Sequence, residues 1–547
     1  MGKLKDYFYN KKLDKWERMM KAVQNRINFN PMRAKFNINN YLDSDLFTRR
    51  IEEYKTWFTG NSTIIRKFYQ SSPNEENLNY FWEKAPTNTI KRHNGVPKLI
   101  ASKGGALIFG GDFKVSVDVY KNDNGEITDT INEKESKRIT DTLNSLIDKM
   151  GLLTILRKQA VIDSWCGHSF GKLNYDLELS QYPIYETFDL TQAEALVERG
   201  IVIGYVFKSY YQKKYRDVKV DYVFKETYTT ENEIAIIKNE LFKLKDGKEI
   251  NCPLTEIEET AELQDIVKFD NVKGMLAFGK PNILPNAEFP NSNYGASDYQ
   301  GSIDSFDSAD ECYSELMSEV RNNKTIRYIP TTMIGQDGYN SFITNYQKVE
   351  ISLDQNAQQE ISIQTIQDKT TDILNKYREC LTTAINNAGL SPLALGITGL
   401  EAINAGEASQ KERNRVTLET RKEKINNFWK PYLKEFFTQL LAFNNYMVKT
   451  VGAKQELDTT NISFDNCNIV LDFGNYVVED ETNVITRWST AKQAGLSSVE
   501  NAVREIHQDW SEEQILEEVT KIKFENNIGV DDPTLLQMDF TNAEDAE

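Results

Sequence analysis

The hydrophobic pattern is strongest between residues 406 and 447, and it changes half-way along. From Ile425 onward apolar side chains recur at intervals of three and four, at Phe428, Trp429, Tyr432, Leu433, Phe436, Phe437, Leu440 and Leu441. This spacing is typical of a helix with a broad buried face. Residues 407–424 are almost all charged or polar, so this half needs a partner or water. Pro431 has no amide hydrogen to donate, which predicts one long helix that bends near Asn427.

Two further amphipathic helices are predicted before this long helix. The first covers residues 303–320, with an apolar face and an acidic back. The second covers residues 363–387, and its polar stripe is formed by Lys369, Asp372, Lys376, Glu379, Thr383 and Asn386. Short strands and turns are expected between the two helices, from residue 325 to 353. An apolar loop broken by Gly and Pro, residues 389–399, then leads into the long helix.

The rest of the chain predicts an α+β fold. Helices are expected at residues 15–20 and 46–57, and a loop boundary at residues 281–299. Between about 80 and 290 we expect strands at 106–109 and 115–119, a hairpin turn at 122–125, helix over 139–161 and strands from 169 to 223. The C-terminal part predicts a strand at 468–473, helices starting near Glu479, Ser497 and Ser511, and an acidic tail.

Charge and cysteine usage narrow the possible functions. The 547 residues include 82 acidic and 65 basic side chains, which gives a formal net charge of -17. An outer surface that grips nucleic acid is therefore disfavoured, whereas a surface past which DNA slides is compatible with this charge. The five cysteines show no close spacing, which favours reduced thiols. No apolar stretch is long enough for a membrane span or a signal peptide, so we expect a cytoplasmic protein without a membrane partner.

No catalytic constellation emerges from the residue types. The phosphate-binding pattern GxxxxGK[ST] does not occur in the sequence. The three histidines, His93, His168 and His507, lie far apart, and only His168 has a cysteine beside it, Cys166. A partly buried turn at residues 165–168 explains that pair more simply than a metal site. We therefore expect a protein that is not an enzyme and that uses neither a cofactor nor a metal.

Several segments resemble, in the right order, the portal proteins of tailed bacteriophages, the siphophage-type head–tail connectors. The resemblance is carried by YGASDYQGSIDSFDSADECYSELMSEVRNNKTIRYIP at 294–330, by GEAS at 406–409 and by TLETRKEK at 417–424. It extends to AKQAGLSS at 491–498, YPIYE at 182–186 and ERG at 198–200. It covers most of the chain from about residue 90, although none of its motifs is individually specific.

The resemblance implies an assembly rather than a monomer. Portal proteins form a ring, usually of twelve subunits, at one capsid vertex of the virion after assembly in the host cytoplasm. Double-stranded DNA passes through the ring, driven by a separate terminase large subunit, and the ring also meets a head–tail adaptor and the major capsid and scaffolding proteins. The implied regions are 1–293 wing, 294–323 stem helix 1, 324–362 clip, 363–388 stem helix 2, 389–405 tunnel loop, 406–479 long kinked helix and return to the wing, and 480–547 crown with an acidic tail.

The candidate functional residues follow from these regions. Lys369 and Lys376 are expected to face DNA, with Asp372, Glu379 and Thr383 on the same stripe preventing tight binding; the alternative is a solvated outer face. Arg321, Lys324 and Arg327 are expected to contact phosphates or a neighbouring subunit. The tunnel loop contributes Leu390, Pro392, Leu393, Leu395 and Ile397, and the contacts between subunits are assigned to Glu407, Lys411, Arg413, Arg415 and Arg421.

Two other functions stay open at this point. One is a phage-derived enzyme that processes DNA, such as a nuclease, which would need a metal-binding cluster. The other is a capsid or scaffold component without a DNA channel.

Overall fold

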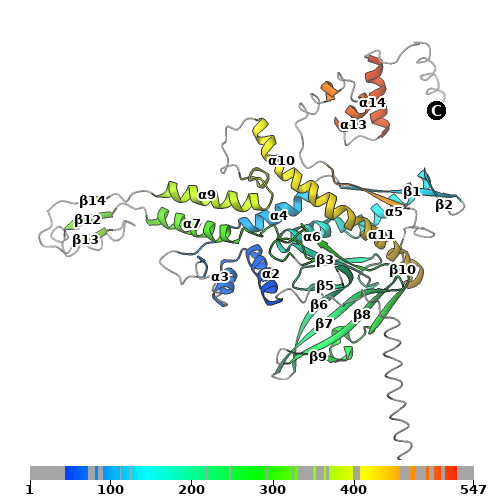
Figure 1. Ribbon diagram of the computed structural model, residues 1–547, viewed down its shortest axis with the longest axis horizontal. Helices are drawn as coiled ribbons and strands as arrows, with labels where there is room; N and C mark the ends of the chain where they lie inside the picture. Colours follow the sequence, from blue (N-terminus) through cyan, green and yellow to red (C-terminus); the bar gives the residue numbers. More distant parts are fainter. Residues whose placement is uncertain are drawn as a thin grey trace, which may run out of the picture. The chain divides into compact units, whose positions relative to one another are not determined.

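A computed structural model of the chain describes residues 44–71, 80–83, 90–110, 113–123, 126–198, 200–215, 218–245, 248–290, 292–322, 326–330, 349–352, 362–364, 369–397, 407–455, 467–474, 488–491, 498–506 and 512–525. The chain divides into two compact units, Met1–Gly474 and Asn475–Glu547. Helices and mainly antiparallel sheets both contribute, which confirms the predicted α+β class (Figure 1).

The largest sheet of the first unit is an antiparallel meander. Its order is β10-β8-β7-β6-β5, and β9 also pairs with β8. Asn232 and Glu233, both at positive φ, form the two-residue turn between β7 and β8, as a tight hairpin of this length requires. The strands are β5 (Ala193–Glu198), β6 (Ile201–Tyr215), β7 (Val218–Glu231), β8 (Ile234–Lys245), β9 (Lys248–Cys252) and β10 (Ile266–Lys273). Two 3-10 turns, η3 (Leu254–Glu256) and η4 (Glu258–Thr260), follow β9.

Two smaller sheets bring distant segments together. In the first, β15 (Cys467–Asp472) pairs antiparallel with β1 (Lys114–Asp123), which also pairs with β2 (Glu126–Ile131). In the second, β3 (His168–Asn174) lies between β4 (Ile184–Phe188) and β11 (Ala277–Pro281). The strands predicted at 115–119 and 468–473 are thus confirmed, and they pair with each other although about 350 residues separate them.

The strand predicted at residues 106–109 is wrong, because these residues belong to helix α4 (Val96–Ile108) and its C-cap. Gly95 at φ 74° and a proline in the first turn start the helix. A Cβ on Gly105 would lie 2.7 Å from the backbone N of Val161, so this glycine allows α4 to approach α6 (Leu152–Cys166) closely. The predicted helical stretch 139–161 is split at Gly151, and its first part is α5 (Glu133–Lys149).

The N-terminal helix predicted at 46–57 is confirmed as part of α2 (Ser44–Thr59), which is followed by α3 (Ser62–Ser71). A buried chain of hydrogen bonds joins them: Trp57 Nε1 donates to Tyr69 Oη at 2.9 Å, and Tyr69 Oη donates to Glu53 Oε1 at 2.6 Å. The helix predicted at 15–20 lies outside the described residues.

The long helix runs through the core of the first unit. It consists of α10 (Glu407–Lys424), a π-helical turn η8 (Ile425–Trp429), α11 (Lys430–Tyr446) and a second π turn η9 (Met447–Val451). All the apolar positions of α11 that the pattern singled out are buried. Phe436, for example, packs against Tyr185 and Phe278, with ring centroids 4.6 and 5.4 Å apart.

The π turn lies at the position where the sequence predicts a bend. Pro431 cannot donate to the carbonyl of Asn427, and the five residues before Lys430 adopt the wider π turn. One continuous long helix is therefore confirmed, whereas the bend itself stays a prediction.

The loop over 281–299 is not a boundary between compact units, because it lies well inside the first one. Its asparagines fasten it to the fold. Asn282 Nδ2 donates to Asp298 Oδ1 at 2.8 Å, and Asn286 Nδ2 donates to the Gly295 carbonyl at 3.0 Å. Tyr299 Oη also donates to the Pro97 carbonyl, at 2.6 Å. The composition of this segment, rich in Asn and Pro, reflects a pinned loop.

The predicted helix, small β element and returning helix are confirmed. They are α7 (Ile303–Asn322), the strands β12 (Ile326–Pro330), β13 (Val349–Ser352) and β14 (Ser362–Gln364), and α9 (Thr370–Asn387). β12 is the central strand, parallel to β13 and antiparallel to β14. The second helix starts later than the predicted residue 363, because residues 362–364 form β14 instead.

The second unit is described by two helices, α13 (Val499–Ile506) and α14 (Glu512–Glu525). Val503, Ile515 and Val519 form a small apolar cluster between them. These helices confirm the starts predicted near Ser497 and Ser511, whereas the start near Glu479 lies outside the described residues.

Candidate functional site

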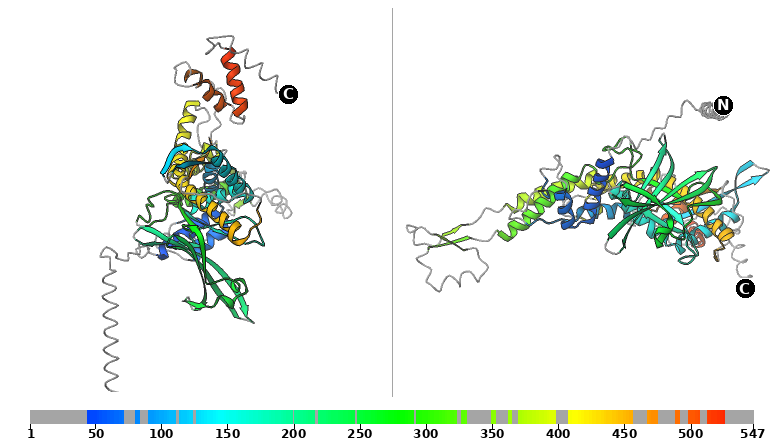
Figure 2. Two further views of the ribbon diagram at one scale, coloured as in Figure 1. Left: turned by 90° about the vertical axis from the view of Figure 1, so that its right-hand side faces the viewer. Right: turned by 90° about the horizontal axis from the view of Figure 1, so that it is seen from below.

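The helices α7 and α9 form an antiparallel hairpin, which Figure 2 shows side by side. Near its middle the rings of Tyr313 and Tyr377 stack with centroids 5.8 Å apart. At its base Asn387 Nδ2 donates to the Gly301 carbonyl at 3.1 Å. The apolar faces that the sequence assigned to the two helices thus meet at Tyr313 and Tyr377, and the polar stripe of α9 remains available for other contacts.

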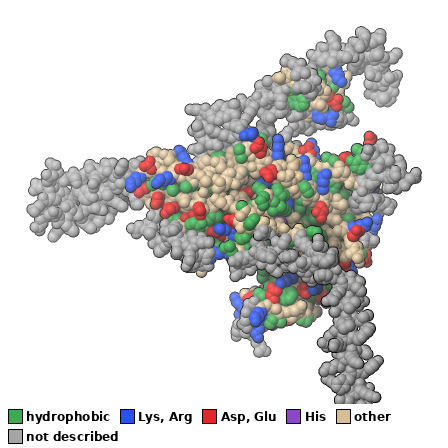
Figure 3. Space-filling model, in the orientation of Figure 1, with side chains coloured by type: hydrophobic (Ala, Val, Ile, Leu, Met, Phe, Trp, Pro, Cys, Tyr) green, Lys and Arg blue, Asp and Glu red, His purple; other side chains and the backbone are tan. Residues whose placement is uncertain are grey.

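The predicted stripe of α9 is exposed along its whole length: Lys369, Asp372, Lys376, Glu379 and Thr383. Their spacing of three and four residues places them on one side of the helix. Basic and acidic side chains alternate, so the stripe as a whole carries no net charge. Figure 3 shows the same mixture of Lys or Arg with Asp or Glu over the described end of the hairpin. Such a surface can contact phosphates briefly, while the carboxylates oppose strong attachment.

The strands β12, β13 and β14 follow the hairpin. Arg327 lies in β12, where its backbone pairs with Val349 on one side and Ile363 on the other. Arg321 lies in the last turn of α7. The side chains of Arg321 and Arg327 lie outside the described part of the structure, as does all of Lys324, so their assignment to a partner contact stays a prediction.

The first half of the expected tunnel loop packs inside the chain, and its assignment to a tunnel stays a prediction. Leu390, Pro392 and Leu395 are buried, and Ile397 is half-buried. The backbone N of Ser391 donates to Thr417 Oγ1 of α10 at 2.9 Å, and Leu393 begins a 3-10 turn, η6 (Leu393–Leu395). The apolar side chains of this segment pack beside α10, because this packing removes their surface from water. The remaining loop residues, 398–405, lie outside the described residues.

Arg421 also needs a correction, because it is an interior residue of the chain and not a contact between subunits. It is only 8% exposed. Its guanidinium donates to the carbonyls of Leu107 at 2.7 Å and Phe473 at 2.9 Å, which come from α4 and from the end of β15. A planar guanidinium can serve several carbonyls at once, and here it ties three segments together.

The other expected subunit contacts lie on the same helix. Arg415 is exposed and lies 3.4 Å from Glu419, a surface ion pair along the helix. Glu407, Lys411 and Arg413 belong to α10, but their side chains are not described.

A buried polar cluster lies where the long helix meets the start of the hairpin. Lys424 Nζ lies 2.8 Å from both carboxylate oxygens of Asp298. Asp298 also accepts hydrogen bonds from Ser164 Oγ at 2.6 Å and from Asn282. Both members of the ion pair are almost fully buried, with 8% and 2% of their side chains exposed. A buried charge needs this density of partners, so the cluster fixes one relative placement of α6, α10 and the segment before α7.

A second buried ion pair lies directly beneath the π turn. Lys280 Nζ lies 2.7 Å from Asp163 Oδ2, and 4.2 Å from the ring centroid of Trp429, the last residue of the turn. Burial raises the pKa of the Asp163 carboxyl and lowers that of the Lys280 ammonium, while their mutual attraction opposes both shifts. The Lys280 side chain thus joins Asp163 of α6 to the ring of Trp429 at the end of the π turn.

Helix α7 carries a further polar cluster that the sequence pattern missed. Asp310 Oδ2 lies within hydrogen-bonding distance of His93 Nδ1, at 2.8 Å, and accepts a hydrogen bond from Trp82 Nε1 at 3.0 Å. Asp307 accepts from the backbone N of Phe81 at 2.7 Å. Burial raises the pKa of the Asp307 carboxyl to about 7. The available signal was that Asp307, Asp310 and Ser314 share one side of α7, at spacings of three and four residues.

His168 is buried, as the sequence suggested for the turn at 165–168. Neither ring nitrogen has a hydrogen-bond partner among the described residues. Burial lowers the pKa of His168 to about 3, so the ring is neutral at physiological pH. In the part of the chain that the structure describes, no three His, Cys, Asp or Glu side chains are grouped so as to hold a metal ion.

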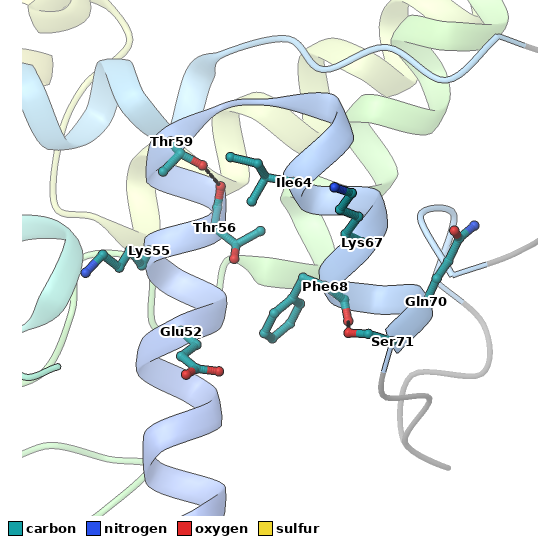
Figure 4. Close-up of a pocket in the computed structure, with 9 residues that line it drawn as sticks. All are labelled: Glu52, Lys55, Thr56, Thr59, Ile64, Lys67, Phe68, Gln70 and Ser71. Atoms are coloured by element: carbon teal, nitrogen blue, oxygen red, sulfur yellow. Dashed lines mark hydrogen bonds between the residues drawn. The ribbon is translucent and has the colours of Figure 1, made fainter. Parts of the chain in front are cut away.

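A separate surface groove of about 760 Å³ lies between α2 and α3 (Figure 4). Ile64 and Phe68 point from α3 toward α2, and Lys55 and Glu52 lie along the α2 side. Glu52 is the one carboxylate among the nine lining residues, which include no histidine or cysteine. The groove therefore offers an apolar surface without an acid–base pair.

Comparison with known proteins adds no further constraint: no family model matches this chain, and no curated protein does either. No described helix is both long enough and apolar enough to span a lipid bilayer.

Proposed function

We propose that this chain is a portal protein, the subunit of a ring at one vertex of a phage capsid through which double-stranded DNA is packaged and ejected. The proposal rests first on the order of elements that the sequence resemblance implies. A helical hairpin carries a small β element between its helices, and a long helix follows it. In this proposal α7 and α9 are the stem, β12–β14 belong to the clip, and α13 and α14 belong to the crown.

The single observation that carries the proposal is the stripe of α9. A helix that lines a wet channel must be apolar on the side that faces its own subunit and polar on the side that faces DNA. Leu381 and Ala384 are buried on the first side, while Lys376 and Glu379 are exposed on the second. Because binding strength follows the number of phosphates neutralised, alternating charges allow DNA to slide.

The ring itself provides a second physical argument. If twelve chains assemble, their net charges of -17 each create a field that repels DNA from most of the surface. DNA is then held loosely along the axis, and force must come from a separate terminase large subunit. The exposed part of α10 near Arg415 supplies a candidate surface for the neighbouring subunit, and the clip is the candidate surface for terminase and the head–tail adaptor.

The buried clusters fit a mechanical role in this proposal. Asp298 with Lys424, and Asp310 with His93, join the base of α7 to the long helix and to the segment before α4. A channel subjected to force needs its stem anchored rigidly to the surrounding domain. Buried, hydrogen-bonded charges favour one packing arrangement over others, and we assign them that role here.

Multi-angle light scattering with negative-stain imaging tests the proposal. A mass near twelve times 63.0 kDa and a ring with a central hole support it. A monomer that cleaves DNA only with divalent cations supports the nuclease alternative and refutes the portal. A closed assembly without a central hole favours a capsid or scaffold component.

A further inference from the structure

Two of the five cysteines occupy facing helices of the hairpin. Cys312 lies in α7 and Cys380 in α9, and both are half-buried. The other three belong to different elements of the first unit: Cys166 ends α6, Cys252 ends β9 and Cys467 begins β15. Only the hairpin thus brings two cysteine-bearing helices against each other in the described part of the chain.

The register of the hairpin places the two cysteines at neighbouring levels of the helix pair, and Cys380 is close enough to influence the Cys312 thiol electrostatically. Tyr313, the residue after Cys312, stacks on Tyr377. Cys380 lies three residues after Tyr377, on the same face of α9. Nearer the base, Ser302 Oγ donates to the Ala384 carbonyl at 3.4 Å, which confirms the antiparallel course. Because the two helices run in opposite directions, Cys312, one residue before Tyr313, faces α9 on the C-terminal side of Tyr377, which is the side of Cys380.

We propose that Cys312 and Cys380 form an intrachain disulfide that closes the hairpin covalently when the protein meets an oxidising environment. With a small disulfide such as oxidised glutathione as oxidant, one thiolate attacks a glutathione sulfur, forms a mixed disulfide and releases one glutathione thiolate. The second cysteine thiolate then attacks the protein-bound sulfur of the mixed disulfide and releases the other glutathione. Two cysteine thiols lose two protons and two electrons, and one glutathione disulfide becomes two glutathione thiols.

The surroundings make this reaction slow at neutral pH. Burial, helped by the nearby Cys380, Glu315 and Glu311 and opposed by Lys376, raises the pKa of the Cys312 thiol to about 11. Burial and the neighbouring Glu379 also raise the pKa of the Cys380 thiol. Since the thiolate is the attacking species, we expect the rate of closure to rise about tenfold per pH unit between pH 7 and 9.

The consequence of closure rests on the proposed function, although the chemistry does not. In a reducing cytoplasm the hairpin remains open to rearrangement during assembly and packaging. After release from the cell, the bond joins the two helices between which β12–β14 lie. The hairpin and its β element then form a closed covalent loop.

The test uses the full-length protein purified under reducing conditions. It is treated with oxidised glutathione, its remaining thiols are blocked with iodoacetamide, and it is digested without reduction for mass spectrometry. We expect one linked peptide pair, containing Cys312 and Cys380, and its loss in Cys312→Ser and in Cys380→Ser. Cys252→Ser and Cys467→Ser are matched controls that should retain the linked pair.

Two results would overturn the inference. One is the absence of a Cys312–Cys380 peptide in the oxidised wild-type protein, which requires no variant to fold. The other is a Cys312–Cys380 peptide that is found in the two-chain band of a non-reducing gel and is absent from the single-chain band, which would mean that the bond joins neighbouring subunits. Ring formation is measured separately by light scattering, so failure of the disulfide and failure of the proposed function are distinguishable.

Discussion

Replacing Lys424 with Met tests whether the buried cluster holds the long helix to the base of the hairpin. Met is similar in length and apolar, so the substitution removes the charge and leaves Asp298 with hydrogen-bond donors but without its counter-ion. Lys424 and Asp298 are 8% and 2% exposed. Breaking a buried pair of this kind by removing one partner typically costs about 3–5 kcal/mol of unfolding free energy.

Arg415→Met provides the matched control on the same helix. Arg415 and Glu419 are 59% and 62% exposed, and their nitrogen and oxygen lie 3.4 Å apart. An exposed pair along a helix contributes about 0.3–0.5 kcal/mol. Lys424→Met should therefore destabilise the protein about tenfold more in free energy than Arg415→Met does.

The assay is urea unfolding followed by tryptophan fluorescence, at one protein concentration because assembly adds to apparent stability. The double variant Lys424→Met/Asp298→Asn completes a cycle. It should be more stable than the sum of the single losses implies, because it removes both buried charges together. Equal stability of Lys424→Met and Arg415→Met, or additive losses in the cycle, would refute the anchoring role of the pair.

Three further predictions address other parts of the molecule. The double charge reversal Lys369→Glu/Lys376→Glu should leave rings intact in negative stain but change DNA packaging or retention. Lys434→Glu/Lys449→Glu, with the same charge change on exposed positions of the long helix beyond α10, should not. Unchanged packaging in the first variant would remove both lysines from the channel. Gly105→Ala should lower the free energy of unfolding by about 1–3 kcal/mol, because the added Cβ would lie 2.7 Å from the backbone of Val161. Gly104→Ala should lower it less, because its Cβ first meets the Ser164 hydroxyl, at 3.1 Å. A larger loss of stability in Gly104→Ala than in Gly105→Ala would be inconsistent with the close contact between α4 and α6. Burial raises the folded-state pKa of Asp307 to about 7, so the folded state holds this proton more tightly than the unfolded state; the stabilisation is complete below pH 4 and is lost as pH rises through 7. The melting temperature of Asp307→Asn, measured relative to wild type, should therefore be higher at pH 7.5 than at pH 5. The same difference at both pH values would contradict the raised pKa.

The periodic parts of the fold could be predicted from the sequence. The apolar positions of α11 and the two faces of α9 repeat at helical intervals, and burial follows that repeat. The exposed stripe from Lys369 to Thr383 was identified for the same reason. A local pattern is sufficient to predict which residues are buried when they lie on one face of a single helix.

The errors have two physical causes. Around residues 106–109 paired glycines suggested turns, but Gly105 is required because helix α6 approaches α4 closely at this position. This contact involves residues about 55 positions later in the chain, so the local sequence pattern does not reveal it. Arg421 and Lys424 were assigned to a charged surface because their neighbours in sequence are charged. Their partners are far away in the chain: Asp298 lies 126 residues before Lys424, and Leu107 lies 314 residues before Arg421.

The candidate site shows the same division. The face of α9 was visible in the sequence, whereas the clusters around Asp298 and Asp310 became visible only when distant segments were placed together. Polar residues on a helix face predict either solvent or a buried network. The partners that decide between these outcomes belong to other elements.

The most direct test of the central claim is an image reconstruction of the assembled protein at a resolution that separates helices. The portal proposal predicts a closed ring with a central channel toward which the face of α9 bearing Lys376 and Glu379 is turned. A ring in which this face points outward, or a protein that remains monomeric at assembly concentrations, would contradict it.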